Sequence, residues 1–306
     1  MIPVGGGKGG VGKTFLVANL AAALAREGYR VVAVDGDLEG ANLHTCLGVA
    51  KPRCSLADFV AQREDDLRKL VLDTPIPRVQ LIAATHGNLA TPQPGHSRRL
   101  RLLRALRELP TDFVLVDLGA GTSPAVMDYF MIGEGGLVVI APEPTSVENA
   151  YAFVRAAFYR RLRLAMVSHE VRRLVTLAMD QRNELGIRTP LDLLREIRAS
   201  DAKEGARFVE TVRAFRPRIV INDARTADDI RLGFSVQSIC RKYFGIDSEY
   251  LGYVNHDDAV RRSVRARSPV VEQQPRSDAA VYIARIAAKL AAPQPSVESD
   301  RLEKGH

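Results

Sequence analysis

Short apolar runs alternate with longer amphipathic stretches along most of the chain. Runs that are rich in β-branched residues and apolar on both sides are typical of strands in a parallel sheet covered by helices on both faces. The runs that we predict as strands are Ile2–Val4, Val31–Val34, Val79–Ala83, Phe113–Val116, Leu137–Ile140, Ile219–Ile221 and Tyr250–Val254. The pattern therefore predicts an α/β fold with a mostly parallel sheet and helices on both faces.

The best-defined helical pattern follows the first predicted strand. Over Lys13–Glu27, the leucines Leu16, Leu20 and Leu24 recur at the spacing that places them on one helix face. Gly28 then stands where a residue of left-handed conformation commonly ends a helix. Only Met1–Val4 precede the glycine-rich segment, and buried strands usually run for five or six residues. We therefore expect Met1 to lie inside the first strand.

The alternation of strands and helices breaks between Tyr151 and Pro217, where only helical patterns occur. One of them, Leu191–Ala199, is preceded by Thr189 as a helix N-cap and Pro190 at the first helical position. The stretch is far longer than the dozen or so residues of an ordinary crossover. We predict one domain over residues 1–292 with a helical subdomain inserted at about 151–217. The polar, Pro- and Ser-containing tail 293–306 is expected to be disordered.

Composition places the chain among soluble globular proteins. Of its 306 residues, 46% are hydrophobic and 26% are charged, and no apolar run approaches the length of a membrane span. The glycine-rich segment starts too early to leave room for a signal peptide. Three cysteines, Cys46, Cys54 and Cys240, fit neither a disulfide framework nor a zinc pair, so we expect a reducing, cytoplasmic setting.

The net charge of +7 permits an acidic partner such as DNA, an anionic lipid surface or an acidic protein. Most of this charge lies in the predicted insertion, where Tyr151–Pro217 holds fourteen Lys and Arg against eight Asp and Glu. Two predicted helices also carry basic clusters, at Arg98, Arg99, Arg101, Arg104 and Arg107 and at Arg261, Arg262, Arg265 and Arg267. A solvated helix face explains such clusters better than a DNA-binding surface does.

A phosphate-binding loop is the strongest chemical signal in the chain. Residues 7–14 read GKGGVGKT and satisfy G-x-x-x-x-G-K-[ST] between a predicted strand and a predicted helix, which is the context that motif needs. Glycines let backbone N–H groups approach phosphate oxygens, and the helix N-terminus favours anions. A flexible glycine-rich turn would not explain Lys13 and Thr14 at this offset. The predicted nucleotide-binding residues are Gly7, Lys8, Gly9, Gly10, Val11, Gly12, Lys13, Thr14, Phe15 and Asn222.

Within this loop, Lys13 is expected to reach the β- and γ-phosphates of ATP, and the Thr14 hydroxyl to bind Mg²⁺. Acidic residues follow two further strands. Asp35 and Asp37 end the second predicted strand and Asp117 ends the fourth, so their carboxylates should face the phosphate site. An aspartate there can orient water for attack on phosphorus. Alone, Asp35-Gly36-Asp37 would also suit a turn, and an Asp at the end of a buried strand is common.

The extra lysine at position 8 makes the loop resemble the deviant Walker A motif of the MinD/ParA family of P-loop ATPases. Residues 34–43, VDGDLEGANL, resemble the switch I of that family, and residues 117–121, DLGAG, resemble its switch II. The resemblance implies that Lys8 contacts phosphate across an ATP-bound homodimer and that Asp37 positions the attacking water. It also implies that Asp35 and Asp117 join Thr14 in holding Mg²⁺. Lys8, Asp37 and Lys13 are then the catalytic residues.

Two later segments extend the resemblance to the nucleotide base. Asn222 ends a strand where many members of the family place an adenine-reading Asn, and residues 251–264 resemble a segment whose backbone flanks the base. Asn255, His256 and Asp257 stand where the family usually carries Pro-Glu-Asp, so this contact departs from the pattern. We interpret His256 as a surface or capping residue. The helical insertion has no counterpart in the resemblance.

The resemblance implies a hydrolysing, ATP-dependent dimerisation switch. Iron–sulfur and amidotransferase relatives are excluded by the missing cysteines and glutaminase domain, and no membrane-targeting helix is evident. The closest likeness is to the branch that regulates flagellar number and cell division. We therefore expect a spatial regulator of cell-division, chromosome, flagellar or polar machinery, with an unknown protein bound through 151–217 or non-specific DNA as partners. The alternative is a targeting or carrier ATPase whose client binds the insertion; a small-molecule ligase or kinase is a third option.

Overall fold

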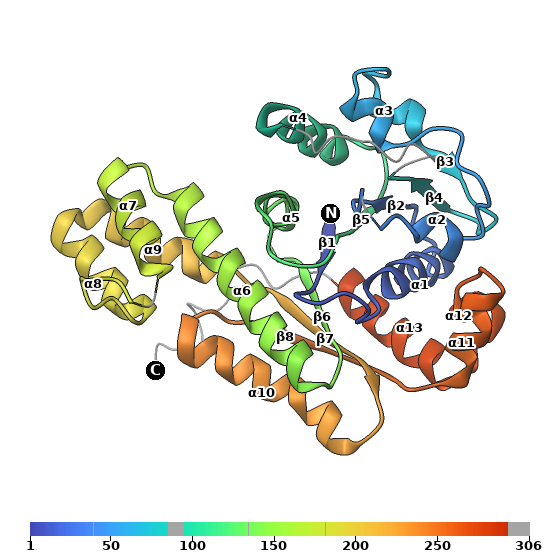
Figure 1. Ribbon diagram of the computed structural model, residues 1–306. Helices are drawn as coiled ribbons and strands as arrows, with labels where there is room; N and C mark the ends of the chain where they lie inside the picture. Colours follow the sequence, from blue (N-terminus) through green and yellow to red (C-terminus); the bar gives the residue numbers. More distant parts are fainter. Residues whose placement is uncertain (39, 85–94, 134, 181, 293–306) are drawn as a thin grey trace, which may run out of the picture.

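A twisted sheet forms the centre of the molecule. The structure is a computed structural model that describes residues 1–38, 40–84, 95–133, 135–180 and 182–292. Within these ranges the sheet has eight strands in the order β3-β4-β2-β5-β1-β6-β7-β8 (Figure 1). The strands are β1 (Ile2–Gly5), β2 (Val31–Asp35), β3 (Leu72–Asp73), β4 (Val79–Ile82), β5 (Phe113–Asp117), β6 (Leu137–Ile140), β7 (Arg218–Ala224) and β8 (Glu249–Asn255). All neighbours pair in parallel except β3 and β4, so the predicted α/β fold is confirmed.

Helices cover both faces of the sheet (Figure 1). The strand β2 shows why, because its alternating residues are buried in two different clusters: Val32 and Val34 in one, Val31 and Ala33 in the other. The helices are α1 (Lys13–Arg26), α2 (Leu43–Cys46), α3 (Leu56–Val60), η1 (Leu67–Leu70), α4 (His96–Arg107), α5 (Pro124–Phe130), α6 (Pro144–Ala165), α7 (His169–Ala178), α8 (Pro190–Ser200), α9 (Ala202–Ala214), α10 (Ala227–Phe244), α11 (Asp258–Arg265), α12 (Val270–Gln273) and α13 (Asp278–Ala291).

Helix α1 follows the predicted leucine pattern. Leu16, Leu20 and Leu24 have no exposed surface and pack in the cluster that α1 shares with α13. Gly28 has a φ of 96°, a left-handed conformation that residues other than glycine rarely adopt. The helix therefore starts at the glycine-rich loop and ends where its sequence predicts.

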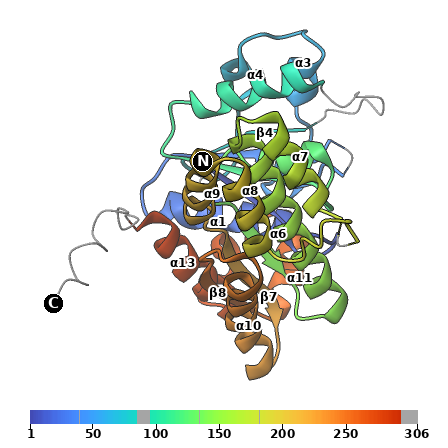
Figure 2. The same cartoon turned by 90° about the vertical axis from the view of Figure 1, so that its left-hand side faces the viewer.

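The segment between β6 and β7 holds the helices α6 to α9, and its described residues contain no strand. Helix α6 runs unbroken past Tyr151, so residue 151 marks no structural boundary. Its first half packs on the sheet domain through Phe153, whose ring meets Phe130 of α5 at 4.8 Å between centroids. The helices α7, α8 and α9 then project from one end of the molecule, as Figure 2 shows from that end.

Helix α8 begins with the N-cap and the proline that its sequence predicts. Thr189 and Asp192 form a reciprocal capping box, and Pro190 occupies the first turn, where its missing N–H costs nothing. The tail 293–306, predicted to be disordered, lies outside the described residues. Within the described ranges, no helix has both the length and the hydrophobicity that crossing a bilayer takes.

Candidate functional site

The predicted site residues meet at the carboxyl ends of the central strands. The glycine-rich loop joins β1 to α1, and Gly12, with a φ of 91°, immediately precedes the first turn of α1. Strand β1 lies beside β5, which lies beside β2 in the same sheet. Because these strands are parallel, the loop and the segments that follow β2 and β5 converge at one edge. The topology thus brings Lys13 and Thr14 together with Asp35, Asp37 and Asp117.

Close packing around the loop explains two of its glycines. A Cβ at position 7 would lie 1.9 Å from the backbone oxygen of Asn149 on α6. A Cβ at position 12 would lie 2.2 Å from the Asn222 side-chain nitrogen at the end of β7. Both approaches are far below van der Waals contact, so a larger residue would push α6 away at position 7 and displace the Asn222 side chain at position 12. The glycines therefore serve the packing of the loop as well as access to phosphate.

Lys13 is a nearly buried cation inside the loop, with 8% of its surface exposed. Its Nζ donates to the backbone oxygen of Lys8 over 3.3 Å. Burial lowers the pKa of the Lys13 ammonium, while the negative charges of Asp117 and Asp37 act in the opposite direction. A buried ammonium of this kind is suited to bind an anion that enters the loop.

Asp35 and Asp117 are paired neighbours at the ends of β2 and β5, with 0% and 2% of their surfaces exposed. Burial raises the pKa of Asp35 to about 8, and repulsion from Asp117 acts in the same direction. Burial also raises the pKa of Asp117 to about 7, although a hydrogen bond from the Thr14 side chain and the charge of Lys13 oppose the rise. Two buried carboxyl groups side by side create a site that favours a cation.

This set of groups fits Mg²⁺. Among the described residues, Oδ1 of Asp117 is buried without a hydrogen-bond partner, which leaves it available to a metal-bound water. Asp35 is already oriented, because Leu43 N–H donates to its Oδ2 and Asp37 N–H to its Oδ1, each over 3.2 Å. Mg²⁺ commonly keeps several waters and takes few protein ligands. Thr14 would bind it directly, and the two aspartates would hold its waters.

Asp37 lies where the segments after β2 and β5 meet. Its Oδ1 accepts a hydrogen bond from Gly40 N–H over 2.9 Å, which folds the segment after β2 back on itself. A Cβ at position 119, in the segment after β5, would lie 3.3 Å from Cγ of Asp37. Asn42 supports the same turn by donating to Gly40 O over 2.7 Å. Asp37 therefore contacts both segments that the sequence predicts to respond to nucleotide.

Lys8 points out of the loop, in contrast to Lys13. Its Nζ lies 2.9 Å from Oε2 of Glu143 and 3.1 Å from Oγ1 of Thr145, both at the N-terminal end of α6. The Lys8 side chain is 39% exposed, and that of Glu143 is 60% exposed. Glu143 and Thr145 were absent from the predicted site, because they lie 135 and 137 residues away from Lys8 in sequence. Only the fold brings them to Lys8.

Asn222 contacts the loop itself. Its Nδ2 donates to the backbone oxygen of Val11 over 2.9 Å, and Phe15 on α1 is half-buried against the core beneath the loop. The neighbouring residue Asp223 makes a short contact of 2.6 Å with Nδ1 of His256. Both side chains of this pair are about half exposed, so His256 lies at the surface beside the loop.

Four of the five arginines on α4 are bound to their own chain. Arg99 pairs with Asp128, Arg101 with Asp65, and Arg98 and Arg107 donate to the backbone oxygens of Val60 and Ile132. Guanidinium groups that are already paired within the chain are poorly placed to bind nucleic acid. The structure thus argues against DNA binding by this cluster, and it shows that Arg99, with 12% of its side chain exposed, is not part of a solvated face either.

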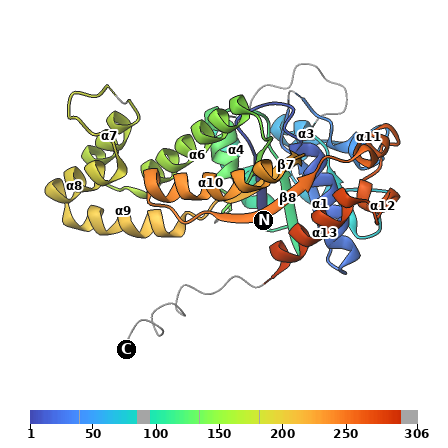
Figure 3. The ribbon, with the colours of Figure 1, turned by 90° about the horizontal axis from the view of Figure 1, so that it is seen from below.

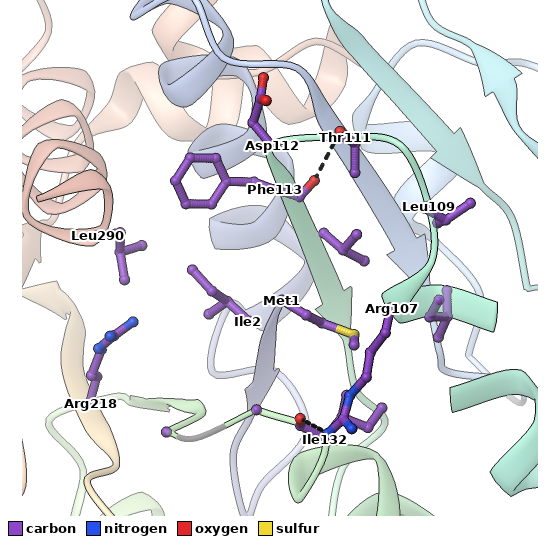
Figure 4. A pocket seen from close by; sticks show the side chains of 14 residues that line it. Met1, Ile2, Arg107, Leu109, Thr111, Asp112, Phe113, Ile132, Arg218 and Leu290 are labelled. Carbon is purple, nitrogen blue, oxygen red and sulfur yellow. Dashed lines mark hydrogen bonds between the residues drawn. The ribbon is translucent and has the colours of Figure 1, made fainter. Parts of the chain in front are cut away.

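A cavity of about 550 Å³ lies at the other edge of the sheet. Figure 4 shows its lining, which includes Ile2, Phe113 and Arg218 at the starts of β1, β5 and β7. The loop and its acidic residues follow the ends of these strands, so the cavity is separate from the predicted nucleotide site.

Comparison with known proteins places the chain in a nucleotide-binding family. Residues 2–270 match the family model described as the CobQ/CobB/MinD/ParA nucleotide binding domain. The antiactivator FleN of Pseudomonas aeruginosa is 27% identical over 293 residues, which span 95% of this chain and 85% of FleN. The septum site-determining protein MinD of Synechocystis is 25% identical over 268 residues, spanning 87% of this chain and 97% of that protein.

Solved structures show the same fold. MinD from Pyrococcus horikoshii, determined with Mg-ADP, aligns with a TM-score of 0.62 at 20% identity and covers 95% of each chain. A variant of McdA from Cyanothece, determined in complex with ATP, aligns with a TM-score of 0.59 at 12% identity, over 96% of this chain and 97% of that one.

Proposed function

Because the chain belongs to the CobQ/CobB/MinD/ParA nucleotide-binding family, we propose that it is a cytoplasmic ATPase in which ATP drives homodimerisation and hydrolysis reverses it. The observation that carries the proposal is the contrast between its two loop lysines. Lys13 is buried within the loop, whereas Lys8 is partly exposed and faces outward. A nucleotide bound in the loop needs one internal cation, so the outward lysine is available to serve a second subunit.

The residues of one subunit have distinct tasks in this proposal. Lys13 binds the β- and γ-phosphates, and the N–H groups of the glycine-rich loop surround them. Thr14, Asp35 and Asp117 hold Mg²⁺, which supplies positive charge to the phosphate oxygens. Asp37 orients a water whose oxygen attacks the γ-phosphorus while the bond to the β–γ bridging oxygen breaks, giving ADP and inorganic phosphate.

The second subunit contributes Lys8. To reach a nucleotide across an interface, its ammonium must leave Glu143 and Thr145. A cation supplied in this way stabilises charge that develops on the transferred phosphoryl group, and trans-acting cations can raise rates by orders of magnitude. Only the triphosphate offers a γ-phosphate to bridge the two loops, so hydrolysis releases the dimer.

Sedimentation with ATP, a non-hydrolysable analogue and ADP tests the proposal. The wild-type protein is expected to dimerise with the analogue and to be monomeric with ADP. Asp37→Ala should form a long-lived dimer with ATP, since it loses water positioning but keeps the phosphate contacts. Lys8→Ala should bind ATP as a monomer with little hydrolysis. A wild-type protein that stays monomeric with the analogue would falsify the dimerisation switch.

Within this switch we favour a spatial regulator, as the names of the relatives suggest, with α7 to α9 as the surface for a protein partner. These helices and the end of α6 expose large apolar side chains, among them Leu164 at 57%, Val167 at 66% and Leu191 at 66%. Comparing proteins that co-purify with Asp37→Ala, with and without Leu191→Ser, tests this surface. A partner retained equally by both would place its binding site elsewhere.

A carrier function is the second candidate. A groove of about 410 Å³ between α6 and α9, with Leu164, Ala165 and Ala214 in its lining, favours it, because it offers an apolar surface to a client. Non-specific DNA is a further candidate partner, favoured by Arg261, Arg265 and Arg267, which are exposed on and just after α11. DNA binding would weaken steeply with salt, whereas binding in an apolar groove would not. A salt series therefore separates these two partners.

A further inference from the structure

Three helices meet at one buried carboxylate. Asp128 on α5 has 7% of its side chain exposed and pairs with two arginines. Nε of Arg99 on α4 lies 2.9 Å from its Oδ2, and Nε of Arg160 on α6 lies 2.9 Å from its Oδ1. The side chains of the arginines are only 12% and 20% exposed. The carboxylate thus joins α5 to α6 through charge-assisted hydrogen bonds from Arg160, and Arg99 adds an ion pair from α4.

Such a cluster fixes geometry more than it adds stability. Ions lose hydration when they are buried, and well-packed apolar residues often replace buried ion pairs without loss of stability. Directed hydrogen bonds between rigid groups, however, hold the helices in one relative position, and a carboxylate with two guanidinium partners offers little freedom to shift. Asp128 is therefore placed to couple the movements of α5 and α6.

Helix α5 is connected to the nucleotide site. It starts two residues after Thr122, and Ser123 caps it by accepting from Val126 N–H over 3.4 Å. The segment before it lies close to the loop, since a Cβ added at position 9 would be 4.0 Å from the Cβ of Ala120. Gly119, in the same segment, lies against Asp37. Any shift of this segment when a γ-phosphate binds or leaves is passed directly to α5.

Helix α6 connects the same point to the projecting helices (Figure 3). Arg160 lies about 24 Å along α6 from Pro144, at 1.5 Å per residue. Beyond it, Glu204 of α9 accepts from Val167 N–H over 2.8 Å, directly after the end of α6. Arg155 also donates to Met179 O at the end of α7 over 2.6 Å. The helices α7 and α9 are thus attached to α6 on both sides of Arg160.

We propose that Asp128 is a positioning residue that transmits the nucleotide state of the segment 118–123 through Arg160 and α6 to the helices α7–α9. This inference rests on the proposed nucleotide switch and adds its regulation: the partner-binding end of the molecule differs between the ATP and ADP states. Arg99 anchors the carboxylate to α4, so that a movement of α5 turns α6 and is not absorbed locally.

Amide hydrogen exchange of the full chain, with ADP and with a non-hydrolysable ATP analogue, tests the coupling. In the wild-type protein, the amide exchange rates of peptides from α7–α9 should differ at least about twofold between the ADP-bound and the analogue-bound protein. A modest population shift is expected to have this size. Arg160→Met should abolish that difference while both nucleotides still protect the loop 6–14. Arg160→Lys, which keeps the charge, should restore part of it. Arg163→Met, an exposed arginine on the same helix, is the matched control and should behave as wild type.

The outcomes separate the inference from the proposed function. Absence of loop protection by either nucleotide would overturn both. Loop protection without a difference in α7–α9, or a difference that survives in Arg160→Met, would overturn the coupling alone. A thermal melt establishes that Arg160→Met is folded; if it is not, Arg99→Met removes the anchor of the same carboxylate and is expected to reduce the difference in the same way.

Discussion

The ammonium of Lys8 and the carboxylate of Glu143 lie 2.9 Å apart, so the lysine proposed to act on a second subunit is bound to its own chain. Thr145 adds a second contact of 3.1 Å. Both groups belong to the start of α6, which also packs against the loop at Gly7. In the proposed switch, dimerisation must break this pair, so the strength of the pair would set how much ATP dimerisation requires.

Glu143→Gln should make dimerisation easier. Exposed ion pairs contribute at most about 1 kcal/mol, so the ATP concentration for half-maximal dimerisation is expected to fall by roughly two- to fivefold. Light scattering during an ATP titration measures the shift. Glu148→Gln makes the same change five residues along α6, where the side chain is also exposed, and should leave the midpoint unchanged. A higher ATP requirement in Glu143→Gln would show that Glu143 supports the dimer instead.

Lys13→Ala should lose nucleotide. The buried ammonium makes charge-assisted hydrogen bonds to phosphates in the proposed complex, and hydrogen bonds to charged groups contribute up to about 3 kcal/mol. ATP affinity should therefore fall about 100-fold or more. Titration calorimetry measures the affinity, and a melting curve establishes that the variant is folded. An unchanged affinity for ATP would refute the assignment of the loop.

Gly7→Ala should destabilise the protein even without nucleotide. The added methyl group would lie 1.9 Å from Asn149 O, a clash that only a shift of α6 or the loop can relieve. Overpacking of this kind costs about 1–3 kcal/mol, which corresponds to roughly 5 °C in melting temperature. Gly9→Ala is the matched control, because its Cβ would meet only Ala120 at 4.0 Å. Equal melting temperatures for the two variants would contradict the close packing of α6 on the loop.

The sequence was sufficient to predict the strands of the parallel sheet and the glycine-rich connection between β1 and α1, because both depend on local signals. A strand buried on both faces must be apolar throughout, as Val31–Val34 is, and a phosphate loop needs glycines and Lys13 at fixed spacing. Strand β3 was missed. It has only two residues, the buried Leu72 and the exposed Asp73, which is too short for a strand pattern to show.

Contacts between distant segments could not be predicted in this way. Arg99 belonged to a cluster that was better explained as a solvated helix face, and nothing near Asp128 in the sequence marks it as the partner of two arginines. The contact between Lys8 and Glu143 could not be predicted either, because it also joins segments far apart in the sequence. Long arginine and lysine side chains reach several possible partners, and the packing of α4, α5 and α6 decides which one is available. The boundary expected at Tyr151 also falls inside α6, since helical periodicity alone does not show where a helix leaves the core.

Asn222 combines an observed contact with an expected one. The resemblance predicts that it reads adenine, whereas its Nδ2 donates to Val11 O in the structure. The two roles are compatible, because an amide has two N–H donors and one acceptor oxygen. The contact with Val11 occupies one donor, which leaves the other groups for the edge of a base.

Asn222→Ala should therefore have two separate effects. Loss of the hydrogen bond to Val11 should lower the free energy of unfolding of the nucleotide-free protein by about 1 kcal/mol, as measured by denaturant titration. Loss of base recognition should reduce the preference for ATP over GTP, measured as the ratio of the two dissociation constants. A variant of Phe15, which lies on α1 beneath the loop, should alter stability without altering that ratio. If Asn222→Ala weakens ATP and GTP by the same factor, the residue supports the loop alone and adenine is selected by other groups.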